Sequence, residues 1–333
     1  MTATQAAAPH EDVQQLEKLV GAVTRLKSQV AQRIVGQEEV VDGILTAILA
    51  GGHALLIGVP GLAKTKLVET LGITLGLDAK RIQFTPDLMP SDIVGSEVLE
   101  EGAGGRRGFR FVKGPIFTQL LMADEINRAS PKTQSALLQA MQEHHVTVAG
   151  VRHDVPRPFH VLATQNPLEQ EGTYPLPEAQ LDRFLLQIDV SYPDVAAERR
   201  MLFATTGVED RVLKTILSAD ELMMAQRVVR ELPVGDQVVD AILKLVRSAR
   251  PGTGNDKTLD DLIAWGPGPR ASQALMLAVR AKAMIDGRLA PSVDDVIDLA
   301  EPVLKHRMAL TFAARAEGIQ MTDMVARLVR PLG

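Results

Sequence analysis

The residues best suited to chemistry in this sequence include a short glycine-containing segment, Gly58-Val-Pro-Gly-Leu-Ala-Lys64-Thr65. It lies between an apolar run that predicts a strand and a pattern that predicts a helix, which is the context of a Walker A phosphate-binding loop. In such a loop, backbone N–H groups at a helix N-terminus hold the phosphates, with Lys64 on the β and γ oxygens and Thr65 on Mg²⁺. Ala63 stands where the pattern has glycine, and we expect its methyl group to be tolerated if φ is negative there. The alternative is an ordinary strand-to-helix turn with a solvated lysine.

Two adjacent carboxylates, Asp124 and Glu125, end the apolar run that begins at Leu120, 60 residues beyond Lys64. On a buried parallel strand they would emerge at the carboxyl edge of the sheet, where open α/β proteins bind ligands. Asp124 would hold Mg²⁺ through its coordination shell, and Glu125 is placed to polarise an attacking water as a general base. Taken alone, the two acids could be solvated groups at a strand end. Combined with the phosphate loop, they predict a nucleotide-hydrolysing site.

Three further polar residues stand where they could serve the same chemistry. Asn166 follows an apolar run and could orient the water or bind the γ-phosphate, although an Asn before Pro is also a common turn former. Arg183 precedes another apolar run, where it could form a surface ion pair or act as an arginine finger in trans. Arg270 lies in the first turn of a predicted helix. It could be a plain helix-start residue. However, a cation is poorly matched to the positive N-terminal end of the helix dipole, and this mismatch favours a bound anion nearby.

Short apolar runs and amphipathic patterns alternate in the first part of the chain and would position these residues. Runs typical of buried parallel strands cover 53–58, 120–124, 160–164 and 184–190, and a weaker one covers 81–85. Helical patterns cover 12–34, 38–49, 65–75 and 132–143. This alternation predicts βαβ units, and therefore an α/β fold with a parallel sheet covered on both faces.

From about residue 195 onward the pattern is helical, and we find no convincing strand. Helices are predicted over 219–231, 235–249, 270–286 and 293–308, separated by Pro and Gly clusters at 251–254 and 266–269. The segments 218–221 and 292–295 resemble capping boxes, the second with Asp in place of Glu. We therefore divide the chain into an N-terminal helical segment (1–34), an α/β core (35–195), a linker (196–217) and a helical lid domain (218–333).

The composition excludes several other kinds of site. The 333 residues are 46% hydrophobic and 23% charged, which is enough apolar sequence for the cores of two domains. The net charge is -5 and only 3% of the residues are aromatic, which argues against a basic or base-stacking nucleic-acid surface. Because there is no cysteine, disulfides, thiolate metal sites and a Cys nucleophile are ruled out.

The hydropathy pattern predicts a protein without a membrane segment. Residues 1–11 contain neither a basic region nor an apolar run, so we do not expect a signal peptide. The segment Ile44–Ala63 carries no Asp, Glu, Lys or Arg for 20 residues, but glycines and a proline interrupt it. We interpret it as a helix end, a loop and a buried strand, and we expect the protein to be cytoplasmic.

These motifs, in this order, resemble those of the AAA+ ATPases, and specifically those of the MoxR family. The resemblance covers roughly residues 12–310. The segments that carry it are IVGQ at 34–37, GVPGLAKT at 58–65, FTPDL at 84–88, KGPIF at 113–117, ADEINRASPKTQSALLQAMQE at 123–143, ATQNP at 163–167 and EGTYPLPEAQLDRF at 171–184. It implies a P-loop core with a five-stranded parallel sheet and an all-helical C-terminal lid domain. An alanine in the phosphate loop is common in this family.

The resemblance also implies where the nucleotide binds. Lys64 and Thr65 correspond to the Walker A pair, and Asp124 and Glu125 to the Walker B pair, with ATP and Mg²⁺ as cofactors and Thr65 and Asp124 at the metal. The segment before the second helix would line the adenine pocket. The implied nucleotide-binding residues are Val35, Gly36, Gly58, Val59, Pro60, Gly61, Leu62, Ala63, Lys64, Thr65 and Lys66.

Four more residues receive roles from the same resemblance. Asn166 looks like sensor 1 and Arg270 like sensor 2. Arg183 looks like the finger that reaches the ATP of the neighbouring subunit. Arg128 lies just past the Walker B acids, on the expected subunit interface.

Proteins of this family assemble into hexameric rings and act as chaperone-like remodellers. They often work with partners that carry a von Willebrand factor A domain, in the maturation or metal loading of other proteins. The resemblance therefore implies a ring of this chain, such a partner and a protein client.

Two segments of the core are expected to lie near the pore of the ring. The family carries an insert in the second helix of its ATPase core, which would correspond to 96–111. Its glycines and the residues Arg106, Arg107 and Arg110 indicate a mobile loop. Residues 144–153 would form a hairpin facing the pore, or alternatively two surface β-turns.

Other functions use similar residues. A nucleic-acid motor is disfavoured by the acidic balance and the scarce aromatics, and binding to DNA that depends on salt would revive it. A small-molecule kinase or a GTPase is disfavoured because no Asn-Lys-x-Asp motif occurs and because the chain has a helical lid. A nucleotide-gated scaffold that hydrolyses slowly would need the same residues as a motor, so this alternative stays open.

Overall fold

The computed structural model describes residues 9–59, 61–101, 107–169, 172–206, 212–253, 259 and 261–333. A five-stranded sheet with the order β2-β5-β8-β1-β9 forms its centre, and every neighbouring pair of strands in it is parallel. This confirms the predicted α/β architecture. The strands are β1 (Ala54–Gly58), β2 (Ala79–Gln83), β5 (Leu120–Asp124), β8 (His160–Gln165) and β9 (Leu186–Val190).

Both faces of this sheet are covered, because alternate residues of each strand face opposite sides. Leu56 and Leu120 pack in a hydrophobic cluster with helices α1 (Pro9–Ala31), α2 (Glu38–Leu49) and α3 (Lys64–Thr74). Their neighbours Leu55 and Leu121 pack on the other face, in a cluster with helix α5 (Pro131–Glu143). The four predicted helices of this region and the five predicted strands are all present.

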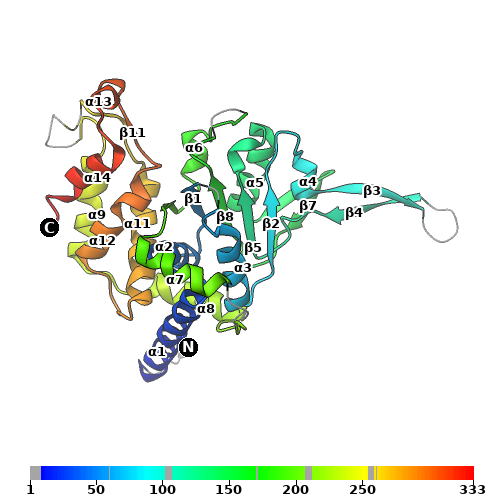
Figure 1. Cartoon of the computed structure of the whole chain (residues 1–333), viewed down its shortest axis with the longest axis horizontal. Coiled ribbons are helices and arrows are strands. Elements are labelled where there is room, and N and C mark those ends of the chain that lie inside the picture. Colours follow the sequence, from blue (N-terminus) through cyan, green and yellow to red (C-terminus); the bar gives the residue numbers. More distant parts are fainter. Residues whose placement is uncertain are drawn as a thin grey trace, which may run out of the picture.

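The C-terminal part is helical, and it packs beside the sheet on the side of α2 (Figure 1). Its buried residues belong to the same cluster as Leu56, so the lid and the core share one hydrophobic interior. The capping box at Ser218 is present, because Ser218 N–H donates to Glu221 at 2.7 Å and Glu221 N–H donates to the Ser218 hydroxyl at 3.3 Å. The helices are α8 (Ala219–Glu231), α9 (Asp236–Ser248), α11 (Pro269–Ile285), α12 (Val293–Leu304), α13 (Phe312–Ala316) and α14 (Met321–Val329).

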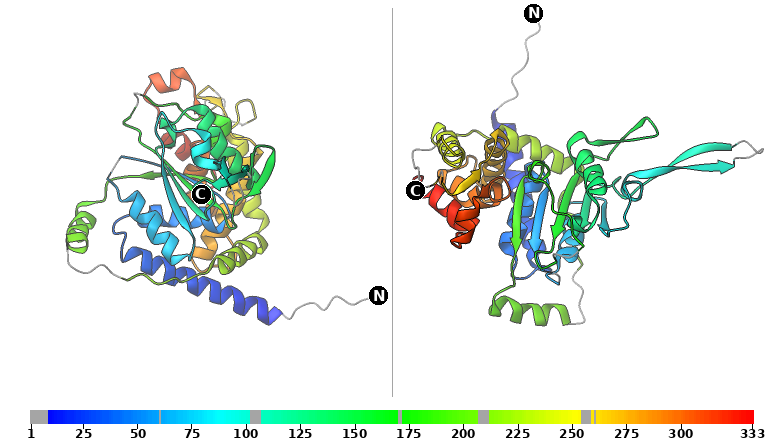
Figure 2. Two further views of the ribbon diagram at one scale, coloured as in Figure 1. Left: turned by 90° about the vertical axis from the view of Figure 1, so that its right-hand side faces the viewer. Right: turned by 90° about the horizontal axis from the view of Figure 1, so that it is seen from above.

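Two features of the C-terminal half differ from the sequence-based expectation. Strands β10 (Ile263–Trp265) and β11 (Ala309–Leu310) form a small antiparallel sheet, so the lid is not composed of helices alone. These strands are too short to show an alternating pattern. Helix α7 (Val195–Thr206) occupies a segment that we assigned to the linker. It lies at the periphery of the molecule (Figure 2), and its exposed apolar residues hide the periodicity that would have predicted it.

Two antiparallel hairpins extend from the core. Strands β3 (Gly95–Glu101) and β4 (Arg107–Lys113) pair along their full length and project far from the sheet (Figure 1). The expectation of a loop over 96–111 is therefore wrong for its described residues, and Arg106 lies outside them. Strands β6 (His145–Val148) and β7 (Val151–Asp154) form the second hairpin, as predicted for 144–153.

The remaining described elements are short. They are α4 (Pro90–Val94), the 3₁₀ helix η1 (Ile126–Arg128) and α6 (Glu178–Leu181). Over the described ranges, no helix is long and apolar enough to cross a membrane. The stretch Ile44–Ala63 consists of the end of α2, a loop, β1 and the phosphate loop, as expected.

Candidate nucleotide-binding site

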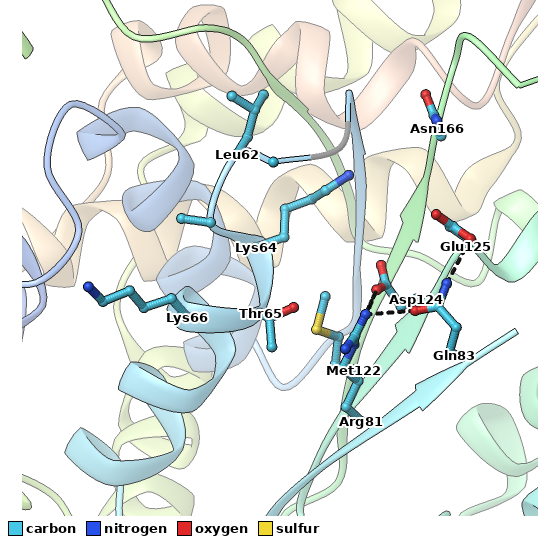
Figure 3. A pocket seen from close by; sticks show the side chains of 12 residues that line it. Leu62, Lys64, Thr65, Lys66, Arg81, Gln83, Met122, Asp124, Glu125 and Asn166 are labelled. Atoms are coloured by element: carbon cyan, nitrogen blue, oxygen red, sulfur yellow. Dashed lines mark hydrogen bonds and ion pairs between the residues drawn. The ribbon is translucent and has the colours of Figure 1, made fainter. Parts of the chain in front are cut away.

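A pocket of about 480 Å³ lies at the carboxyl edge of the parallel sheet, where the ends of β1, β2, β5 and β8 meet (Figure 3). It brings the predicted phosphate loop and the predicted acid pair together, because both follow neighbouring parts of the same sheet edge. Its lining residues are Gly61, Leu62, Ala63, Lys64, Thr65, Lys66, Arg81, Gln83, Met122, Asp124, Glu125 and Asn166.

The phosphate loop turns sharply from β1 into α3, which begins at Lys64. Gly61 has a φ of 85°, and a Cβ built there would have no atom within 4 Å, so the loop leaves open space above the helix N-terminus. Ala63 has a φ of 55°, so the condition of a negative φ, under which we expected its methyl group to be tolerated, is not met. A left-handed alanine costs about 1 kcal/mol or more relative to glycine, so the loop conformation is strained at the pocket. Pro60 lies outside the described residues.

Gly58 is required for a different reason. A Cβ at this residue would lie 2.6 Å from the carbonyl oxygen of Val190 on the neighbouring strand, which leaves no room for a side chain. Val59, which follows it, packs against the hydrophobic core. The start of the phosphate loop is therefore fixed by the sheet.

Lys64 and Thr65 extend into the pocket from the first turn of α3 (Figure 3). Lys64 Nζ donates to the carbonyl oxygen of Gly58 at 2.7 Å, which folds the lysine back along the loop. Burial lowers the pKa of Lys64, while the negative charges of Asp124 and Glu125 oppose that shift. The ammonium group therefore faces both acids across a pocket that is wide enough to admit phosphate groups.

Asp124 is held by one neighbour on each side of its strand. The Thr164 hydroxyl on β8 donates to Oδ1 of Asp124, and the Arg81 guanidinium on β2 donates to Oδ2, through Nε at 3.2 Å. The carboxylate is 13% exposed. Its orientation is fixed, and its charge is balanced by an arginine.

Glu125 lies directly after β5 with a φ of 55°, a strained conformation for a residue with a side chain. Its N–H donates to the Thr164 hydroxyl at 2.9 Å, so this threonine positions both acids. Its carboxylate accepts hydrogen bonds from Gln83 Nε2 at 2.7 Å and from Arg128 at 3.0 Å. Arg128, which we placed on a subunit interface, thus forms an ion pair with Glu125 within the chain, and this pairing raises the pKa of Arg128.

Sequence reasoning missed three residues that hold the acids, namely Arg81, Gln83 and Thr164. Arg81 and Gln83 are two positions apart on β2 and so face the same side of that strand. The weak strand pattern at 81–85 indicated that residues two positions apart face the same side. The side chains reach the pocket because β2 pairs with β5 in a register that places Gln83 beside Asp124.

Asn166 lines the pocket just after β8 and is 6% exposed. Its Oδ1 accepts a hydrogen bond from the Leu168 N–H at 3.1 Å, so the side chain also forms a turn before the next segment. The two interpretations of this residue are therefore compatible. Within the described part of the chain, its amide nitrogen donates no hydrogen bond and so can contact a ligand.

Val35 and Gly36 do not line the phosphate pocket. Gly36 has a φ of 75°, and a Cβ there would lie 2.4 Å from Cβ of Ala197 at the start of α7. The segment is nevertheless connected to the phosphate loop, because Gln37 Nε2 donates to the carbonyl oxygen of Leu62 at 3.0 Å. Gln37 is buried and is a further residue that sequence analysis did not assign to the site.

Arg183 and Arg270 also lie outside this pocket. The Arg183 guanidinium donates to the carbonyl oxygen of Leu138 on α5. Arg270, at the start of α11, lies 3.5 Å from the carboxylate of Asp182, the residue next to Arg183. Arg270 therefore lies at the boundary between the lid and the core, whereas the Arg183 guanidinium contacts α5 within the core, and neither residue lines the pocket at the phosphate loop.

The donor set of the pocket fits a magnesium nucleotide. A pocket at a helix N-terminus and a half-buried lysine fit phosphate groups. A threonine hydroxyl and an aspartate carboxylate are oxygen ligands, which Mg²⁺ prefers, and Figure 3 shows the Thr65 hydroxyl pointing across the pocket towards Asp124. Lys64, Thr65 and Asp124 are thus the residues that would hold such a group.

The fold and this pocket define a P-loop protein of the AAA ATPase class. A family model described as "ATPase family associated with various cellular activities (AAA)" matches residues 53–186, and a model of the AAA lid domain matches residues 257–328. The crystal structure of a candidate ATPase from Cytophaga hutchinsonii superposes with a TM-score of 0.88 at 35% identity, and the match covers 96% of this chain and 97% of the other.

Curated relatives identify the family within that class. The chain is 41% identical to the chaperone MoxR1 of Mycobacterium tuberculosis, over 97% of this chain and 85% of the relative. It is 31% identical to the protein MoxR of Paracoccus denitrificans, over 84% and 86% of the two chains. The chain belongs to the MoxR family of AAA+ ATPases, as its motifs predicted.

Proposed function

We propose that this protein binds ATP with Mg²⁺ and hydrolyses it in the pocket at the carboxyl edge of the sheet. The observation that carries this proposal is the position of Lys64, at the N-terminus of α3, opposite Asp124 and Glu125 in one pocket. Membership of an ATPase family supports it. When bound, Mg²⁺ would neutralise charge on the phosphate oxygens.

Each residue of the pocket then has a defined task. The loop N–H groups and Lys64 bind the phosphates, and Thr65 and Asp124 supply oxygen ligands. Glu125 accepts a proton from the attacking water as general base. For this step its carboxylate must face the water, so the hydrogen bonds from Gln83 and Arg128 have to loosen when substrate binds. Asn166 orients the water or contacts the γ-phosphate through its amide.

The active unit is proposed to be a ring, with ATP at the contacts between subunits. Arg183 lies outside the pocket of its own chain, which suits a residue that acts on the nucleotide of a neighbour. Arg270 would respond to the nucleotide from the lid. The hydrolysis cycle would then change the angle between the core (35–195) and the lid (218–333).

The work of this ring is proposed to be the remodelling of a protein client. One relative is described as a chaperone, which supports this class of activity. The finer proposal is maturation or metal insertion with a partner that carries a von Willebrand factor A domain, in the cytoplasm. The hairpins β3–β4 and β6–β7 are the elements we propose to face the pore of the ring.

The mass of the Glu125→Gln protein in solution, with ATP and Mg²⁺ and then without, tests this proposal. Growth from a monomer to about six subunits on addition of ATP is the expected result, because this variant should retain ATP without cleaving it. A monomer in both states, with ATP binding confirmed, would refute self-assembly and favour the nucleotide-gated scaffold. Binding of DNA that weakens steeply with salt would instead favour a nucleic-acid motor.

A further inference from the structure

A second pocket, of about 540 Å³, lies at the opposite edge of the sheet from the nucleotide site. His160, at the start of β8, lines it, whereas Asn166 follows the end of that strand. A six-residue parallel strand separates these ends by about 17 Å, so the two pockets are distinct. The residues that line the second pocket are Gly51, His144, Arg157, Pro158, Phe159, His160, Met223, Gln226, Arg227 and Arg230.

Three guanidinium groups face this pocket, and no aspartate or glutamate lines it. Arg227 and Arg230 lie three positions apart on α8 and so share one face of that helix, and Arg157 lies opposite them before β8. Within the described residues, none of the three side chains forms an ion pair or donates a hydrogen bond. Asp154, which is outside the pocket lining, interacts electrostatically with Arg157. In a chain with a net charge of -5, three arginines around one pocket are nevertheless a local concentration of positive charge.

The walls of the pocket are held by partly buried hydrogen bonds. Gln226, on the same face of α8, donates to the Ile48 carbonyl oxygen at 2.9 Å and to Nε2 of His160 at 3.0 Å. His160 in turn donates from Nδ1 to the carbonyl oxygen of Gly52 at 2.8 Å. These bonds attach α8 to the core, so the arginines of α8 and Arg157 keep their places relative to one another.

The two histidines do not contribute to the positive charge. Burial lowers the pKa of His160 to about 4, and burial together with the charge of Arg157 lowers the pKa of His144. Both are neutral at pH 7. The pocket therefore presents three permanent guanidinium charges above an apolar base formed by Pro158 and the buried Phe159.

We propose that this pocket binds a small anion with several phosphate groups. Guanidinium groups donate paired hydrogen bonds that match phosphate oxygens, and three of them can neutralise most of the charge of a di- or triphosphate. The volume accommodates such a group, and the pocket opens between the core and the first helix of the lid. A ligand there would connect α8 with the segment before β8, far from the ATP.

Calorimetric titration of the full chain with inorganic tripolyphosphate tests the proposal, because this probe carries no base or lipid. Since the probe can also occupy the phosphate loop, the titration is made in the Lys64→Ala background. We expect one site to remain there, and the added changes Arg227→Gln and Arg230→Gln to weaken it at least tenfold. Both side chains are exposed, so these changes should leave the fold intact, which the thermal transition would verify.

The matched control is Arg327→Gln, an exposed arginine on α14 outside this pocket, which should leave the affinity unchanged. The proposal fails if Lys64→Ala alone abolishes all binding of tripolyphosphate. It also fails if the two α8 substitutions weaken binding no more than the control does. Either result would leave the proposed ATPase function untouched, because that function uses only the first pocket.

Discussion

Asp182 and Arg307 form an ion pair between the core and the lid, although 125 positions separate them in the chain. Arg307 is 3% exposed and donates from Nε to the Asp182 carboxylate at 2.8 Å. Its other N–H groups donate to carbonyl oxygens on both sides of the boundary, those of Phe184, Leu185 and Val303. The segment that carries Arg183 is therefore held by a buried arginine of the lid.

Replacing Arg307 tests how much this residue contributes to the stability of the fold. Arg307→Lys keeps the charge but cannot form the fork of hydrogen bonds, so several buried acceptors lose their donor. We expect the free energy of unfolding to fall by about 3 kcal/mol in urea denaturation. Arg327→Lys, on the exposed face of α14, is the matched control and should change it by less than about 0.5 kcal/mol. A loss below about 1 kcal/mol for Arg307→Lys would contradict the assigned role.

The proposed role of Glu125 as general base predicts how its replacement changes ATP turnover. Glu125→Gln should bind ATP with nearly unchanged affinity, but hydrolyse it roughly 10² to 10⁴ times more slowly, because the general base is lost. Lys64→Ala should lose nucleotide binding itself, since the cation that contacts the phosphates is gone. Binding of a fluorescent ATP analogue and release of phosphate are measured in parallel. Unchanged hydrolysis in Glu125→Gln would remove this residue as the base.

The position of Arg183 predicts complementation between subunits. Arg183→Ala should bind ATP normally and hydrolyse it poorly. Mixed with Glu125→Gln subunits it should recover part of the activity, because the mutant lacking the arginine still has a complete acid pair. The control mixture uses a double variant, Glu125→Gln with Arg183→Ala, which cannot donate an arginine. Equal activity in the two mixtures would argue against action in trans.

The strained alanine of the phosphate loop gives a stability prediction. Ala63→Gly removes a Cβ from a left-handed residue, and we expect the free energy of unfolding to rise by up to about 1 kcal/mol. Ala326→Gly, in the exposed middle of α14, should instead lower it by about 1 kcal/mol, because glycine is a poor helix former. Chemical denaturation of both variants measures the difference. Equal losses would show that the loop alanine is not strained.

Three buried histidines, His53, His160 and His306, predict a loss of stability in acid, and burial lowers the pKa of His306 well below its ordinary value. Burial lowers the pKa of His53 to about 3 and that of His160 to about 4. His53 accepts the Val161 N–H at Nδ1, so protonating that nitrogen would break a buried hydrogen bond. The unfolded chain takes up these protons below about pH 6.5 and the folded chain does not, so stability falls as pH falls from about 6.5 towards 4.

The expected size is about 2 kcal/mol per histidine at pH 5. Urea unfolding at pH 7.5, 6 and 5 measures it. In His160→Gln the same titration should be less steep, because the unfolded chain takes up one proton fewer. An identical pH slope in the variant and the parent would rule out His160 as a source of the effect.

Local sequence patterns were sufficient to predict the five strands of the parallel sheet, most of the helices and the phosphate loop. A buried strand must be apolar and an amphipathic helix must repeat every 3.6 residues, so Leu120–Asp124 and Ala219–Glu231 could be located without a structure. Elements whose buried and exposed residues do not follow such a pattern were not predicted. Helix α7 exposes apolar residues, and β10 and β11 are too short to alternate.

What the sequence determined by itself is the chemistry available: a lysine and a threonine after one strand, two acids after another, and the family to which these motifs belong. Which side chains hold these groups depends on how the chain folds. Arg81 and Gln83 reach the acids because β2 pairs with β5, and Thr164 reaches them because β8 lies on the other side. Such contacts join residues that are far apart in the chain, and they depend on the order and register of the strands. A local pattern of hydrophobic residues contains no information about strand order or register, so these contacts could not be predicted from it.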